Sequence, residues 1–178
     1  IKLADGTETT VSLALKETYP HLEEAKADTL GVLNALHLVE KEYFKEPDRA
    51  QTTLATALAG FFRSVRFGVH EAHGKANMVI YSFLKEQGGY LHDPATGRFS
   101  VAFDKARAGL TALAAEILRI QATGDYAASQ AFLARYGEMT PEVQAALDKL
   151  SDLPVDIRPR YLTLSAIRGV GDDRQGVR

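Results

Sequence analysis

The chain is organised around one hexapeptide, Glu23-Glu24-Ala25-Lys26-Ala27-Asp28, which leads directly into an apolar run. The apolar positions that continue it at helical spacing are Leu30, Leu33, Leu36 and Val39. Pro20 stands just before this stretch, where the first turn of a helix tolerates proline. We therefore predict a long helix from about His21 to Phe44, with a polar start and one face directed into a core.

Two carboxylates of the hexapeptide, Glu24 and Asp28, are four residues apart, so a helix would place both on one face. Zinc enzymes use such a Glu-x-x-x-Asp pair: one carboxylate is a metal ligand, and the other orients a ligand histidine from further out. A solvated acidic first turn that complements the helix dipole would have the same pattern. Taken alone, the hexapeptide favours this second interpretation.

The composition of the whole chain is that of an ordinary folded domain. Its 178 residues are 46% hydrophobic and 25% charged, and the net charge of −2 gives no reason to expect a nucleic acid or an anionic membrane as partner. The chain has no cysteine, so any metal must be held by His, Asp or Glu. No membrane-span or signal-peptide pattern is present, and we expect a cytoplasmic protein. Because the first residue is Ile1 rather than Met, we also expect a processed product or a segment of a longer protein.

The remaining sequence predicts a single, mostly helical domain over residues 1–178. Asp5-Gly6 is a turn pair, so residues 1–9 should form a loop or a short hairpin. Helical periodicity runs from Arg49 to about Lys85, with a break expected near Phe67-Gly68-Val69. The clear β signal is Tyr90 to Phe103, where two short strands flank a turn that contains Pro and Gly.

Three further helices are expected after the hairpin, each with a recognisable start. The first is capped by Asp104 and runs through Ile120, the second spans residues 126–136, and the third has Thr140 as N-cap. Asp48 should cap the helix that begins at Arg49. Residues 154–159 should be extended, and 169–178 a loose tail. The predicted fold class is mainly α, with one small β-hairpin near residues 90–103.

A second polar cluster, His70-Glu71-Ala72-His73-Gly74-Lys75-Ala76-Asn77, lies within a helix-forming region. Its histidines are three residues apart, whereas the zincin motif His-Glu-x-x-His has them four apart and occurs nowhere in the chain. For His73, a structural and a functional role remain equally open, because polar residues accompany it and Gly74 permits close approach. The other histidines, His21, His37 and His92, are interpreted as structural. No dinucleotide-binding, Walker or nucleophile-elbow motif is present.

The two clusters, in this order, resemble the dipeptidyl peptidase III family of zinc metallopeptidases. That family has a His-Glu-x-x-Gly-His segment, then a Glu-Glu-Cys-Arg-Ala-Glu-like segment, then a histidine segment. Residues 23–28 resemble the second motif and residues 71–77 the third. Their forms here are those of the bacterial and plant branch, some of whose plant members also carry a Nudix domain. The resemblance extends from roughly His21 to Arg158, which makes this chain similar to a downstream segment of the catalytic region.

The resemblance implies a role for each matching residue. Glu24 would be a zinc ligand, and Glu23 would lie next to it, further from the metal. Asp28 would hold a ligand histidine in position. His73 would contact the substrate carbonyl or its developing oxyanion. Asn77 and Glu71 would lie in the substrate cleft. The implied cofactor is zinc, and the implied substrate is a peptide from whose N-terminus a dipeptide is hydrolysed.

The first motif of the family, with two zinc-binding histidines and the catalytic glutamate, is absent from this sequence. We therefore expect this segment to be inactive alone and to need an upstream part of the parent chain. A missing part also predicts an exposed apolar surface, through which a homo-oligomer could form. The alternative is a non-catalytic helical interaction module, in which residues 23–28 are a solvated helix start and His73 is structural or contacts a partner.

Overall fold

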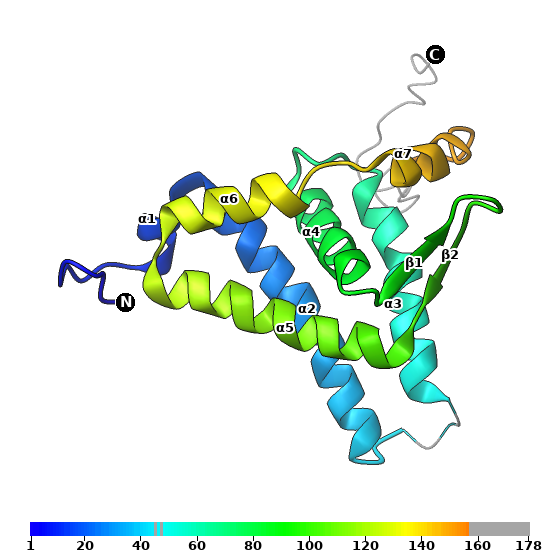
Figure 1. Ribbon diagram of the computed structural model, residues 1–178, viewed down its shortest axis with the longest axis horizontal. Coiled ribbons are helices and arrows are strands. Elements are labelled where there is room, and N and C mark those ends of the chain that lie inside the picture. The colour runs from blue at the N-terminus through cyan, green and yellow to red at the C-terminus, as the bar shows by residue number, and fades with distance from the viewer. Residues whose placement is uncertain (45, 47, 157–178) are drawn as a thin grey trace, which may run out of the picture.

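The computed structural model describes residues 1–44, 46 and 48–156, and within them it is a helical fold with one two-stranded hairpin (Figure 1). The mainly α class and the single small hairpin are therefore confirmed. A short 3₁₀ turn, Lys16–Thr18, links the first two helices. The elements are α1 (Val11–Leu15), α2 (Tyr19–Glu40), α3 (Arg49–Val65), α4 (Ala72–Glu86), β1 (Tyr90–Asp93), β2 (Arg98–Val101), α5 (Phe103–Thr123), α6 (Tyr126–Tyr136) and α7 (Pro141–Asp148).

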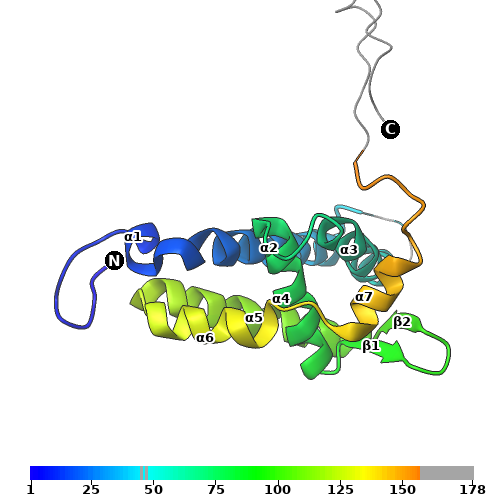
Figure 2. The ribbon, with the colours of Figure 1, turned by 90° about the horizontal axis from the view of Figure 1, so that it is seen from above.

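Helix α4 is the most enclosed element, because it packs against α2, α3, α5 and α6. Figure 2 shows α2 and α3 in one layer and α5 and α6 in another, with α4 bridging the two. The residues that α4 buries are Gly74, Ala76, Met78, Val79, Tyr81, Phe83 and Leu84. Helix α2 contributes the buried face Leu22, Ala25, Thr29 and Leu36, which meets α4 and α5. The long helix that carries the acidic hexapeptide is thus held on several sides by the core.

Two predicted helix boundaries are wrong. Helix α2 ends at Glu40 rather than Phe44, because Glu42 takes a left-handed backbone (φ 58°). Beyond that point Tyr43 is 75% exposed, so no core contact would hold a further turn. Helix α5 starts at Phe103 with Ala102 as N-cap, so Asp104 lies in the first turn instead of capping it.

The start of α5 is set by the strand that precedes it. Ala102 N donates to Gly89 O (2.8 Å), which ties the returning strand to the end of α4. A Cβ at Gly89 would lie 2.6 Å from Ala106 Cα, so glycine is required where α5 crosses this loop. The boundary depends on a contact between distant parts of the chain.

The hairpin pairs Tyr90 with Val101 and His92 with Phe99 in an antiparallel register. Asp93 holds its turn, because its carboxylate accepts from Ala95 N (2.9 Å) and Thr96 Oγ1 (2.7 Å). Phe99 docks the hairpin on the helices through an edge contact with Phe62, with ring centroids 4.9 Å apart. A lone hairpin is marginal in water, so this aromatic contact accounts for its persistence.

Some of the remaining sequence predictions concern residues that the structure describes, and others concern residues outside that part of the chain. A bridge between Lys2 and Glu8 closes the predicted N-terminal turn, and the predicted break between α3 and α4 spans residues 66–71. Helix α6 has the predicted bounds. Residues 154–156 form no regular structure, and the predictions for 157–159 and for the tail at 169–178 lie outside the described residues. Among the described helices, none is long and apolar enough to cross a membrane.

Candidate functional site

The two sequence clusters meet where the N-terminal turn of α4 lies against α2. His73, in the first turn of α4, places Nδ1 3.1 Å from Glu24 Oε2. The His73 side chain is 66% exposed and that of Glu24 is 35% exposed, so both are accessible from solvent. With Nδ1 facing Glu24, Nε2 is the nitrogen left free to meet a ligand.

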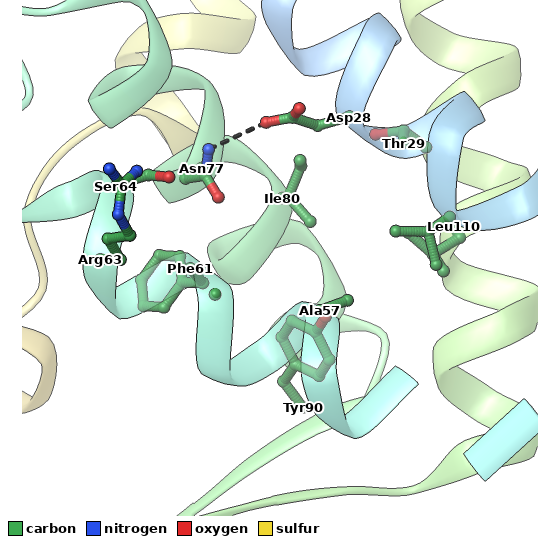
Figure 3. Close-up of a pocket in the computed structure, with 12 residues that line it drawn as sticks. Asp28, Thr29, Ala57, Phe61, Arg63, Ser64, Asn77, Ile80, Tyr90 and Leu110 are labelled. Atoms are coloured by element: carbon green, nitrogen blue, oxygen red, sulfur yellow. Dashed lines mark hydrogen bonds between the residues drawn. The ribbon is translucent and has the colours of Figure 1, made fainter. Parts of the chain in front are cut away.

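Asp28 and Asn77 form a second link between the same two helices, one turn further along. Asn77 Nδ2 donates to Asp28 Oδ2 (3.0 Å) and to the backbone oxygen of His73 (2.9 Å). Figure 3 shows the first of these bonds spanning α2 and α4. Four of the predicted site residues, Glu24, Asp28, His73 and Asn77, are therefore brought together in one line between α2 and α4.

Glu23 and Glu71 do not join this line. Glu23 faces α5, where its carboxylate accepts from Gln121 Nε2 (2.9 Å) and pairs with Lys26 (2.7 Å). Burial acts to raise the pKa of Glu23, but these hydrogen bonds outweigh it and the pKa is lowered. Glu71 is the exposed N-cap residue of α4 and makes no side-chain capping bond. The structure thus separates these two residues from the other four.

A cavity of about 350 Å³ lies beside Asp28 and Asn77, between α2, α3 and α4 (Figure 3). Its wall is mostly apolar, with Val32, Phe61 and Ile80 among the lining residues, while Arg63 and Ser64 add polar groups. Thr29 lines it too, and its buried Oγ1 has no hydrogen-bond partner. Sequence reasoning singled out Asp28 and Asn77 but missed Thr29, Arg63 and Ser64. Adjacency to Asp28 was the local signal for Thr29, whereas Arg63 and Ser64 lie on α3 and are far from Asp28 in the sequence.

His21 is a further polar residue at the same junction, one turn before Glu24 on α2. Its Nδ1 is buried and has no hydrogen-bond partner. Burial first, and then the positive charge of Lys75, lower the pKa of His21. A neutral imidazole packed between helices agrees with the structural role predicted for this histidine.

The described residues do not form a complete zinc site. Within residues 1–44, 46 and 48–156, no group of three or more His, Asp or Glu side chains is arranged to hold a metal ion. Zinc in a catalytic site takes three protein ligands and keeps a fourth position open. Glu24 has the chemistry and exposure of one such ligand, so these residues fit a contribution to a metal site but not the whole of it.

The fold defines a class of protein, a helical segment of the kind found in dipeptidyl peptidase III structures. The structure of DPP III from Caldithrix abyssi matches with a TM-score of 0.86 and 40% identity, covering 94% of this chain and 32% of that one. Dipeptidyl-peptidase III from Corallococcus sp. strain EGB matches with a TM-score of 0.85 and 39% identity, covering 94% of this chain and 30% of that one. The predicted resemblance to a segment of the dipeptidyl peptidase III family is confirmed.

A curated plant protein, Nudix hydrolase 3 of Arabidopsis thaliana, is 36% identical over 170 residues. The match covers 94% of this chain and 22% of the plant protein. No family model matches the chain. The chain therefore spans about a fifth of the curated relative and about a third of the solved structures.

Proposed function

We propose that this chain is a segment of a zinc-dependent dipeptidyl peptidase, which hydrolyses dipeptides from the N-termini of peptides. The observation that carries the proposal is the contact between Glu24 and His73, which brings the two family-like motifs within 3.1 Å of each other. The identity of about 40% over nearly the whole chain supports it further.

Each residue then has a defined task. Glu24 supplies one zinc ligand, and the metal when bound activates water and polarises the scissile carbonyl. Asp28 braces a ligand histidine, and Asn77 holds the Asp28 carboxylate in place (3.0 Å). His73 directs its free Nε2 toward the carbonyl oxygen and strengthens that hydrogen bond as negative charge develops there. Glu23 keeps the Glu24 turn of α2 fixed to α5 through Gln121.

The two predicted substrate contacts belong to the same proposal. Asn77 lines the cavity between α2, α3 and α4, and Glu71 lies at the exposed entrance to α4. A peptide bound along the start of α4, with its scissile carbonyl at His73, would lie close to both residues.

The rest of the metal site comes from the His-Glu-x-x-Gly-His motif, which this sequence does not contain. The segment alone then lacks two ligands and the general base, and it hydrolyses no peptide. Association of this chain into a homo-oligomer through exposed apolar side chains, such as Leu13 and Tyr43, remains a prediction that sedimentation would test.

The test is zinc content and dipeptidyl-arylamide hydrolysis by the full-length parent and by this segment. We expect stoichiometric zinc and activity in the parent only, with Glu24→Ala removing both and His73→Ala lowering kcat about 10²- to 10³-fold. Glu40→Ala is the matched control, because Glu40 is an exposed carboxylate of the same helix that pairs with Arg107. A parent without zinc and without activity would favour the helical interaction module instead.

A further inference from the structure

The side-chain amide of Asn77 joins the two halves of the junction, and its orientation is fixed by chemistry. Both of its partners, the Asp28 carboxylate (3.0 Å) and the backbone oxygen of His73 (2.9 Å), are hydrogen-bond acceptors. An ionised carboxylate and a carbonyl can only accept, so the nitrogen of the amide must face them. The opposite orientation would place an oxygen against two oxygens.

Both hydrogens of the Asn77 amide are consequently used within the protein. The nitrogen has none left to donate to a substrate, and only Oδ1 remains, which can only accept. Figure 3 shows this oxygen turned away from Asp28. Most of the hydrogen-bonding capacity of Asn77 is spent on linking α2 to α4, which limits the part it can take in binding a peptide directly.

The imidazole of His73 has few interactions of its own, so its position depends on how its backbone is held. Its imidazole is 66% exposed, and the contact with Glu24 is the side-chain interaction that the structure gives it. The first turn of α4 has Glu71 as N-cap without a side-chain capping bond. An exposed side chain at such a helix end takes its position from its own backbone, and Asn77 hydrogen-bonds that backbone and links it to Asp28 of α2.

We propose that Asn77 is a positioning residue that acts through His73. By holding the His73 carbonyl against Asp28, it fixes the first turn of α4 and with it the distance from the imidazole to Glu24. It also links Asp28, which braces a zinc-ligand histidine in the proposed site, to His73, which contacts the carbonyl oxygen. The two residues therefore keep a fixed position relative to each other. The kinetic part of this inference rests on the proposed peptidase function, whereas the structural part does not.

The kinetic test uses the full-length parent with Asn77→Ala and Asn77→Asp. We expect kcat to fall about 10- to 100-fold for Asn77→Ala, as for other groups that orient a catalytic residue, with KM changed less than about twofold. Asn77→Asp should be the more damaging variant, because it sets a second carboxylate against Asp28 and the His73 carbonyl. Asn34→Ala, at an exposed asparagine of α2, is the matched control.

A double-mutant cycle separates action through His73 from other roles. In a His73→Ala background, Asn77→Ala should lower kcat much less than it does alone, because only its bond to Asp28 is then left to lose. A raised KM with unchanged kcat would overturn the inference in favour of direct substrate binding. Full additivity of the two substitutions would overturn it as well. If His73→Ala itself left kcat unchanged, the proposed role of His73 would be wrong instead, whereas a parent without zinc and without activity would refute the peptidase function.

A spectroscopic test needs no activity and uses this chain itself. Asn77→Ala should shift the imidazole ¹⁵N resonances of His73, while Asn34→Ala should leave them in place. Circular dichroism would establish that both variants retain their helices. Unchanged His73 resonances in folded Asn77→Ala would contradict a positioning role whatever the enzyme does.

Discussion

Gly74 stands where the first turn of α4 presses on the loop that precedes it. A Cβ added there would lie 2.0 Å from Gly68 O and 2.8 Å from Gly68 C. Both are backbone atoms, which cannot rotate aside as the end of a side chain could. The close approach that the sequence suggested at Gly74 is thus made to the α3–α4 loop.

Replacement of Gly74 should therefore be costly at a site where helix propensity alone would favour alanine. We expect Gly74→Ala to lower the free energy of unfolding by about 2 kcal/mol. Gly31→Ala is the control, because nothing lies within 4 Å of its Cβ position in α2, and it should stabilise the chain by up to about 1 kcal/mol. Urea denaturation measures both, and equal effects would show that the loop yields freely.

Glu142 gives the chain an acid-sensitive contact between α7 and α4. It pairs with Lys85 and accepts from the Tyr81 hydroxyl (3.1 Å). Burial acts to raise the pKa of Glu142, but hydrogen bonds from Lys85, from its own backbone N–H, from Thr140 and from Tyr81 outweigh it, and the pKa falls from 4.5 to about 2. The folded state therefore holds the charged form more tightly, and this stabilisation is complete above pH 4.5 and is lost as the pH falls toward 2.

From this sign we predict the effect of Glu142→Gln on stability. At pH 7 the variant should lose on the order of 1 kcal/mol, because a charge-assisted hydrogen bond is replaced by a weaker one. The difference from the unchanged chain should shrink between pH 4.5 and pH 2, measured by urea denaturation at each pH. Glu138→Gln, at a carboxylate 66% exposed, should show a smaller difference throughout. A gap that widened in acid would contradict the assigned pKa.

For individual residues, the sequence identified those site residues that belong to a local motif. It did not identify residues whose interaction partners lie far away in the chain. Glu24 and His73 were singled out by their own neighbours in the chain. Thr29 and Glu142 were not, because each gains its importance from another helix. Helical spacing turns Glu23 away from the face that Glu24 and Asp28 share, but its partner Gln121 on α5 had no sequence signal.

Helix ends show the same distinction between local and distant causes. The boundary between α5 and α6 was predicted well, because Gly124 adopts the left-handed conformation (φ 63°) that ends a helix and Asp125 caps the next one. The start of α5 was predicted two residues late, with Asp104 as the cap in place of Ala102. A hairpin that returns to Gly89 sets that start, and no residue near Asp104 encodes it.

A comparison of two aspartates tests this assignment of caps. Asp125 Oδ1 accepts from Ala128 N (2.9 Å), so Asp125→Ala should cost about 1 kcal/mol of stability. Asp104 lies in the first turn of α5, where it only complements the helix dipole, and Asp104→Ala should cost a few tenths of a kcal/mol, about 0.3 to 0.5. Chemical denaturation of both variants gives the ranking. A larger loss for Asp104→Ala would restore it as the cap.

The proportion of buried residues is high in the central helix α4 and low in α7, near the end of the described chain. Helix α4 buries seven of its 15 residues and touches most other helices, whereas α7 buries only Val143. Burial of apolar contacts determines how much of a protein must open before an amide exchanges with solvent. The stability of local elements should therefore follow this gradient rather than helix length.

Native-state hydrogen exchange would reveal that gradient. We expect amides of α4 and of the middle of α2 to exchange only through global unfolding, so their rates should follow the full denaturant dependence. Amides of α7 should exchange through a smaller opening that leaves the α2–α4 junction intact. Exchange of α7 at the global rate would mean that its contact with Tyr81 and Lys85 joins it to the core. The Glu142→Gln variant is the internal check, because loss of that contact should speed exchange in α7 and leave α4 unchanged.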